Sequence, residues 1–146
     1  MNLRPQILVV SSDQDHRREL TAILQKEGWS PLHASRLTEC QDLLAKRNIS
    51  LVFCERRLAD GTYRDLLSVV QAPERRVPVV VTSRLADWDE YLEALRYGAV
   101  DLIPSPCKPS DVSSAIAQAQ QEDLGSSADT SSQSESKLRS VSASGV

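Results

Sequence analysis

Runs of consecutive apolar residues are the feature of this sequence that most constrains its fold. Residues 7–10, 51–54 and 77–81 show no alternation of polar and apolar positions. A strand with one face in water alternates, whereas a strand without alternation is covered on both faces, as in parallel sheets between helices. We therefore expect these runs to be strands of a buried parallel sheet.

Helical patterns lie between these runs and follow the last of them. Leu20 and Leu24 repeat at helical spacing in the first pattern, and Trp88, Leu92 and Leu95 give the fourth an inward face. Two weaker strands are expected, at residues 31–34 and 102–103. Five repeats of strand then helix predict an α/β fold with a five-stranded parallel sheet, helices on both faces and right-handed crossovers.

The distribution of residue types along the chain predicts one domain. Residues 1–121 carry every strand and helix pattern, whereas residues 122–146 hold nine serines and almost no large apolar side chains. Such a segment cannot bury enough surface to offset the entropy lost on ordering. We therefore expect a single folded domain over 1–121 and a Ser-rich disordered tail over 122–146.

Charge and cysteine content argue against several classes of protein. The net charge is −3 with acids and bases interleaved, which gives no basic field for nucleic acid or for anionic lipid. No apolar run is long enough to cross a bilayer or to serve as a signal peptide, so a cytoplasmic protein is expected. Cys40, Cys54 and Cys107 are widely spaced, which predicts buried reduced thiols rather than disulfides or a zinc site.

The carboxyl ends of the expected strands are where a site is expected, because parallel α/β sheets bind their ligands there. The residues at these ends are Ser11, Ser12, Glu55, Ser83 and Ser105. The sequence therefore predicts a pocket in which hydroxyl groups surround a single carboxylate.

Four segments, in order along the chain, carry a resemblance to a known family. They are residues 7–10 with the two positions after them, residues 51–55 with the loop 58–61, Pro78 with Ser83, and Gly98-Ala99 with Pro106. They resemble four segments of the receiver domains of two-component signalling. In the same order, these are the first strand with its acidic pair, the phosphoacceptor strand with its loop, the strand that ends in a hydroxyl residue, and the Gly-Ala and Lys-Pro segments. The resemblance covers residues 5–121 and implies a (βα)5 flavodoxin-like receiver fold.

The chain departs from the family pattern at the positions that carry the family's chemistry. Ser11 and Ser12 stand at the magnesium-binding acidic pair, Glu55 at the phosphoacceptor aspartate and Ser105 at the lysine. Hydroxyls are poor ligands for a hard divalent cation, and the extra methylene of a glutamate displaces its carboxylate from in-line attack. Ser83 alone keeps the family's residue type. The resemblance therefore implies a degenerate receiver, or pseudo-receiver, that is not an enzyme and has no cofactor, its magnesium ligands being lost.

Further residues are candidates for a lid and for a partner surface. Arg84 is expected to contact Glu55, directly or through one water, and so to close the pocket. Tyr91 is expected to be exposed on the fourth helix and to form a partner surface with Tyr97 and Leu102. Leu102 stands at the position of the family's aromatic switch residue. This chain therefore lacks the aromatic ring that takes part in the family's coupled Thr–Tyr rearrangement.

The leading hypothesis is a stand-alone receiver-like domain of phosphorelay signal transduction that is not phosphorylated and acts as a protein-interaction module. The partner classes it implies are a histidine kinase, a downstream signalling protein or a second copy of the chain, with no nucleic acid and no membrane. Two alternatives remain open. One is a phosphoacceptor receiver with a non-standard site built from Asp13 and Asp60, although Asp13 is also expected to cap the first helix. The other is a small flavodoxin-like ligand binder.

Overall fold

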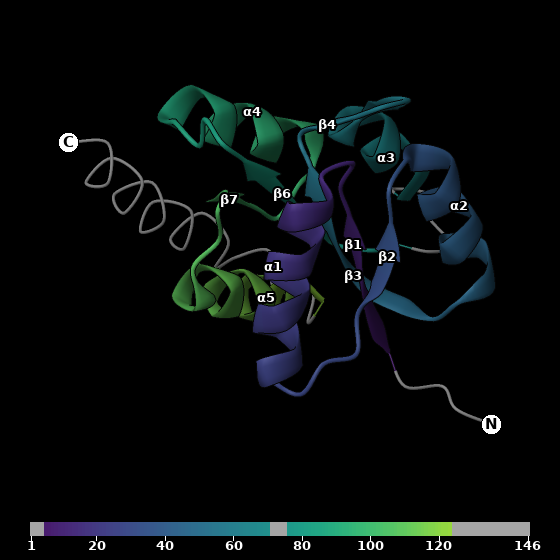
Figure 1. The fold of residues 1–146 in the computed structure, drawn as a ribbon. Helices are drawn as coiled ribbons and strands as arrows, with labels where there is room; N and C mark the ends of the chain where they lie inside the picture. The colour runs from purple at the N-terminus through teal and green to yellow at the C-terminus, as the bar shows by residue number, and fades with distance from the viewer. Residues whose placement is uncertain (1–4, 71–75, 124–146) are drawn as a thin grey trace.

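Seven strands and five helices make up the described residues, 5–70 and 76–123, of this computed structural model (Figure 1). In chain order they are β1 (Gln6–Val10), α1 (Gln14–Lys26), β2 (Leu32–Ala34), α2 (Leu37–Lys46), β3 (Ile49–Glu55), β4 (Arg57–Leu58), β5 (Gly61–Thr62), α3 (Tyr63–Val70), β6 (Val79–Ser83), α4 (Trp88–Tyr97), β7 (Asp101–Pro104) and α5 (Pro109–Asp123). From residue 124 onward, the expected tail lies outside the described residues. No helix in the described part of the chain has the length and apolar character that a membrane span requires.

A five-stranded sheet forms the centre of the domain. Its strand order is β2-β1-β3-β6-β7, and every neighbouring pair is parallel. The predicted α/β fold with a parallel sheet is confirmed. The order reverses direction between β1 and β3, so the crevice outside the carboxyl ends of these two strands is where this topology places a binding site.

Helices cover both faces of the sheet, and each face has its own core. Ile7 and Val9 of β1 point to the core under α1 and α5, which lie side by side (Figure 1). Leu8 and Val10 point to the other core, under α2, α3 and α4. Successive side chains of a strand point to opposite faces, and both faces are covered, so all four are buried. Each contributes roughly 1.5–3 kcal/mol by its burial.

Helix α4 turns a different face to the core from the one its sequence predicted. Tyr91 is 2% exposed and Ala94 is fully buried, whereas Trp88 and Leu92 are 38% and 36% exposed. The small side chain of Ala94 allows close contact between α4 and the sheet, and the ring of Tyr91 fills the core beside it. The expectations that Tyr91 is exposed and that Trp88 and Leu92 point inward are therefore wrong.

The loop after β3 contains structure that the sequence did not predict. Strands β4 and β5 pair antiparallel as a separate two-stranded sheet, with Arg57 opposite Thr62 and Leu58 opposite Gly61. This hairpin extends from the end of β3 that carries the predicted site, so it adds Arg57 to that end of the molecule.

Candidate functional site

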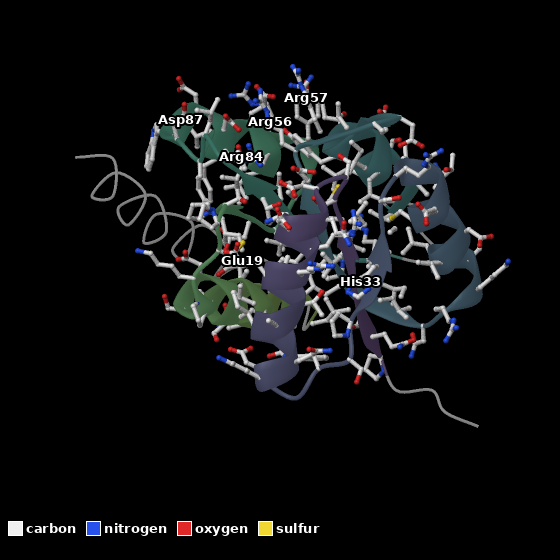
Figure 2. All side chains as sticks on the ribbon, viewed as in Figure 1. Glu19, His33, Arg56, Arg57, Arg84 and Asp87 are labelled. Atoms are coloured by element: carbon white, nitrogen blue, oxygen red, sulfur yellow. The ribbon has the colours of Figure 1, made fainter. Side chains whose placement is uncertain are left out.

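The predicted site residues meet at the carboxyl ends of the strands, as the topology requires. Ser11 follows β1, Glu55 ends β3, Ser83 ends β6 and Ser105 follows β7. A cavity of about 170 Å³ opens here. Its lining contains Glu55, the three arginines Arg56, Arg57 and Arg84, and the hydroxyl residues Thr82, Ser83 and Ser105. Figure 2 shows the three arginines gathered at this end of the molecule.

Glu55 is held by the two serines that stand at the acidic-pair positions. The Ser11 hydroxyl donates to Glu55 Oε1 at 2.8 Å. The backbone N–H and the hydroxyl of Ser12 approach the same oxygen at 3.2 and 3.5 Å. Ser11 is fully buried, so its hydrogen bond to the carboxylate is shielded from water. The charge of Glu55 is therefore met by hydrogen-bond donors of its own chain.

Arg84 pairs with Asp13 rather than with Glu55. Arg84 Nη2 lies 2.8 Å from Asp13 Oδ2. As predicted, Asp13 caps α1, because its Oδ1 accepts the backbone N–H groups of Asp15 and His16 at 2.9 and 3.3 Å. The hydrogen bond from the His16 N–H, and the Arg84 guanidinium nearby, lower the pKa of Asp13. This ion pair takes the place of the expected Arg84–Glu55 contact, because Asp13 presents its second oxygen to Arg84 while Glu55 is bonded to the serines.

Ser83 is bonded to helix α4. Its hydroxyl donates to Glu90 Oε1 at 2.8 Å and accepts the Leu85 N–H at 3.1 Å. Arg56 Nε lies 3.4 Å from the same oxygen of Glu90. These contacts join the end of β6, the first turn of α4 and the residue after β3. The hydroxyl that the family directs at a phosphoryl group is thus already engaged in this chain.

His16 is a site residue that the sequence did not reveal. Its side chain is 7% exposed. Its Nε2 lies 3.1 Å from Thr82 Oγ1, and its Nδ1 lies 3.1 Å from Ser105 Oγ. Both hydroxyl residues line the cavity. His16 has no metal-ligand spacing, and its one sequence signal was its place in the first helical turn after the serine pair.

Asp60 lies apart from these residues and caps another helix. Its Oδ1 and Oδ2 accept the backbone N–H groups of Leu37 and Thr38 at 2.7 and 3.2 Å. These hydrogen bonds lower the pKa of Asp60, and the bond from the Leu37 N–H has the largest effect. They cap α2, whose own N-cap residue, Arg36, makes no side-chain capping bond. Asp13 and Asp60 therefore serve two different helices, and the structure does not assemble them into the alternative phosphoacceptor site.

Leu102 and Tyr97, the other two residues of the expected partner surface, have opposite surroundings. Leu102 is 3% exposed and packs in the core under α4, because β7 is covered on both faces, so its assignment to the surface is wrong. Tyr97 is 44% exposed. Its ring meets Tyr63 edge-on with centroids 6.5 Å apart, and Arg64 Cζ lies 4.3 Å from its centroid. Arg64 also forms an ion pair with Glu93, so α3 and α4 are joined at the surface.

These contacts do not fit the magnesium ion that the resemblance implies. Magnesium needs oxygen ligands in near-octahedral geometry and takes carboxylates for preference. Glu55 is the carboxylate in the cavity lining, and one of its oxygens already accepts hydrogen bonds from Ser11 and Ser12. Within residues 5–70 and 76–123, no three His, Cys, Asp or Glu side chains cluster in a way that could hold a metal ion.

Comparison with known sequences identifies one family over most of the chain. The response regulator receiver domain matches residues 7–117. The alginate biosynthesis transcriptional regulatory protein AlgB of Pseudomonas aeruginosa is 34% identical over 114 residues, which cover 77% of this chain and 25% of that protein. The response regulator protein PilR of the same species is 28% identical over 103 residues, which cover 70% of this chain and 23% of that protein. The chain thus spans about a quarter of the length of these curated relatives.

Comparison with solved structures gives the same fold. The receiver domain of the Francisella response regulator 1452 has a TM-score of 0.72 at 17% identity and covers 82% of this chain and 99% of its own. The signal receiver domain of an HD domain-containing protein from Pseudomonas fluorescens Pf-5 has a TM-score of 0.73 at 21% identity, with 84% and 98% covered.

Proposed function

The chain belongs to the response regulator receiver domain family, and we propose that this member acts as a protein-interaction module that is not itself phosphorylated. Receiver domains are in general signalling modules without enzymatic activity, and response regulators act through protein partners. The histidine kinase and the downstream signalling protein are the partner classes proposed here, with a cytoplasmic location.

The observation that carries the proposal is the hydrogen bond from Ser11 to Glu55, 2.8 Å long. A carboxylate that accepts a phosphoryl group has to be free to attack, and a cation has to offset the charge of the incoming group. Here the residue at the position of the first acidic ligand donates to the carboxylate at the phosphoacceptor position. The side chain at a cation-binding position of the family, Ser11, therefore binds the carboxylate of Glu55 instead of a cation.

The surroundings of α4 support the same proposal. Ser83, at the hydroxyl position of the family's switch, is bonded to Glu90 of α4, and Leu102, at the ring position, is a buried aliphatic side chain. Both parts of the coupled rearrangement that the family uses are thus changed. We propose that the domain holds one conformation rather than switching between two.

A partner surface is proposed on and beside α4. The large apolar side chains that are exposed in the described part of the chain are Val69, Leu85, Trp88, Leu92 and Tyr97, and all but Val69 belong to this region. Aromatic side chains that are partly exposed on one helix are typical anchors of protein interfaces. Of the residues expected from sequence, Tyr97 remains in this proposed surface.

The proposal is tested by incubating the protein with acetyl phosphate and magnesium and measuring its intact mass. We expect an unchanged mass, while a receiver domain that keeps the family's acidic pair, phosphoacceptor aspartate and lysine, treated in parallel, controls for the reagent. A stoichiometric phosphoryl adduct on this chain would refute the proposal. The variant Ser11→Asp, Ser12→Asp, Glu55→Asp should begin to bind magnesium, whereas the three single variants should not, because one carboxylate does not restore the ligand set.

A further inference from the structure

We propose that the cavity at the strand ends binds a small oxyanion without a metal ion, and that His16 sets how many hydroxyl groups donate to it. This inference goes beyond the proposed function, because it assigns a reversible ligand to a pocket for which phosphotransfer is not proposed. It rests on the charge of the cavity lining, on its size and on the two hydrogen bonds of His16.

The charge of the lining favours an anion. Three guanidinium groups, those of Arg56, Arg57 and Arg84, line the cavity with one carboxylate, that of Glu55, and two of the three are paired with acids outside the lining. A guanidinium has five N–H donors in a planar fork that matches an oxyanion, so the ion pairs of Arg84 with Asp13 and of Arg56 with Glu90 leave donors unused. Glu55 is itself met by donors from the serine pair, which weakens its repulsion of a second anion.

The size of the cavity suits a small ion. Its volume is about 170 Å³. A water molecule occupies about 30 Å³ in the liquid, so the cavity has the volume of about six waters. An ion with the dimensions of acetate, sulfate or phosphate fits this space. The ligand class is therefore a small carboxylate or a tetrahedral oxyanion.

The hydroxyls of Thr82 and Ser105 couple this cavity to His16. Each is bonded to a different nitrogen of the imidazole, and both residues line the cavity. A neutral imidazole has one N–H and one acceptor nitrogen, so one of the two hydroxyls donates its hydrogen to the ring. A protonated imidazole donates from both nitrogens, so both hydroxyls accept from it and both keep a hydrogen for a ligand in the cavity.

Proton uptake by His16 is therefore expected to favour anion binding, and anion binding to favour proton uptake. Histidine is the side chain whose charge ordinarily changes between about pH 5 and 8. Asp13, three residues before it, interacts electrostatically with His16, and the cavity that its two hydroxyl partners line also carries Glu55, Arg56, Arg57 and Arg84. A bound anion adds negative charge to the cavity that Thr82 and Ser105 line, and negative charge nearby favours the protonated imidazole.

Sulfate is the probe for the experiment, because its charge stays constant over this pH range. Backbone amide resonances of Thr82, Ser83 and Ser105 are followed in EDTA during a titration with sulfate at fixed ionic strength. We expect saturable shifts, with an apparent Kd roughly tenfold weaker at pH 8 than at pH 5.5, as one linked proton allows. His16→Gln should remove this pH dependence.

The other histidine provides a matched control. His33 is exposed, and its Nε2 is bonded to Thr21 Oγ1 at 2.6 Å, away from the cavity lining (Figure 2). His33→Gln should therefore keep the wild-type response. Ser105→Ala keeps the imidazole and removes one hydroxyl, so it should weaken sulfate binding at pH 5.5 even if His16→Gln does not fold. Shifts that fail to saturate, that are equal at both pH values, or that survive Ser105→Ala unchanged would overturn the inference. A phosphoryl adduct in the acetyl phosphate experiment would instead refute the proposed function.

Discussion

Serine in place of an acid changes the direction of hydrogen bonding at the end of β1. A carboxylate at Ser11 would repel Glu55 and would need a cation between them, whereas the serine hydroxyl donates to Glu55 directly. Strand register was enough to predict that these two residues meet. It was not enough to predict the partner of Arg84, because a long side chain can reach any acid within several ångströms, and Asp13 lay closer to it than expected.

Two substitutions of Asp13 separate its cap from its ion pair. Asp13→Asn keeps the oxygen that caps α1 and removes the charge beside Arg84, whereas Asp13→Ala removes both. We expect Asp13→Ala to lower the melting temperature by roughly 3–6 °C at pH 7, and Asp13→Asn to lower it less.

The pH dependence of Asp13→Asn follows from the lowered pKa of Asp13. The stability that comes from the ionised carboxylate is present above the ordinary pKa of an aspartate and is lost as the pH falls through the folded value. The wild type and Asp13→Asn should therefore converge in acid, as measured by urea unfolding at pH 7 and at about pH 3. A difference that grows in acid would contradict this assignment.

The three cysteines should be unreactive in the folded protein. All three are free and buried, and burial raises the pKa of Cys40 and of Cys107 to about 12. The pKa of Cys54 is also raised by burial. Because the thiolate is the nucleophile, iodoacetamide at pH 8 should modify none of them before unfolding and all three in urea, as read by intact mass. Rapid labelling of the native protein would show that one of them is accessible.

At the scale of elements, α2 depends on a residue that lies outside it. The turn between β4 and β5 delivers the Asp60 carboxylate to the first N–H groups of α2, from more than 20 positions along the chain. The hairpin and the helix are therefore stabilised together. A cap of this kind joins two elements that share no sheet.

Asp60→Ala should destabilise the domain more than the removal of a surface acidic side chain that caps no helix. It leaves the Leu37 and Thr38 N–H groups without their side-chain acceptor, so we expect a fall in melting temperature of roughly 3–6 °C. Asp42→Ala is the control, because Asp42 lies in the same helix and makes only an exposed ion pair with Lys46. Equal losses in the two variants would show that Asp60 does not act as a cap.

Local patterns predicted the elements, and contacts between distant residues decided most of what they missed. Unbroken apolar runs predicted the buried strands, because only a sheet covered on both faces accommodates them. Helix α4 carries two competing stripes, and the small residue Ala94, which a pattern of large apolar residues overlooks, decided between them. The roles of His16 and Asp60 depend on partners 20 or more positions away, and spacing along the chain carries no signal for those.

At the scale of the whole molecule, α4 is tied to the rest of the domain at both ends. Glu90, in its first turn, binds Ser83 and Arg56, and Glu93 and Tyr97 contact Arg64 of α3. Exposed ion pairs and cation–π contacts are each worth about 1 kcal/mol or less, so the restraint comes from their number and from the buried face of α4.

Magnesium should leave the stability of the whole domain unchanged. A ligand that binds the folded state raises its melting temperature in a saturable way. We expect neither such a rise nor a change in tryptophan fluorescence at millimolar magnesium for the wild type, because the serine pair and Glu55 satisfy one another. The triple variant with three aspartates should show the rise. A saturable rise in the wild type would mean that the site still binds the metal.

The proposed single conformation, with α4 anchored through Ser83 and Glu90 at one end and through Arg64 at the other, is the one shape that the domain would offer a partner. All molecules of the domain would then be in the conformation that binds, so the affinity for the partner would not be lowered by a small population of that conformation. Occupancy follows from the concentrations of the two proteins and of any competitor. Such a domain would signal through its abundance, which synthesis and degradation set. A receiver domain that switches signals instead through the fraction of its molecules that are modified.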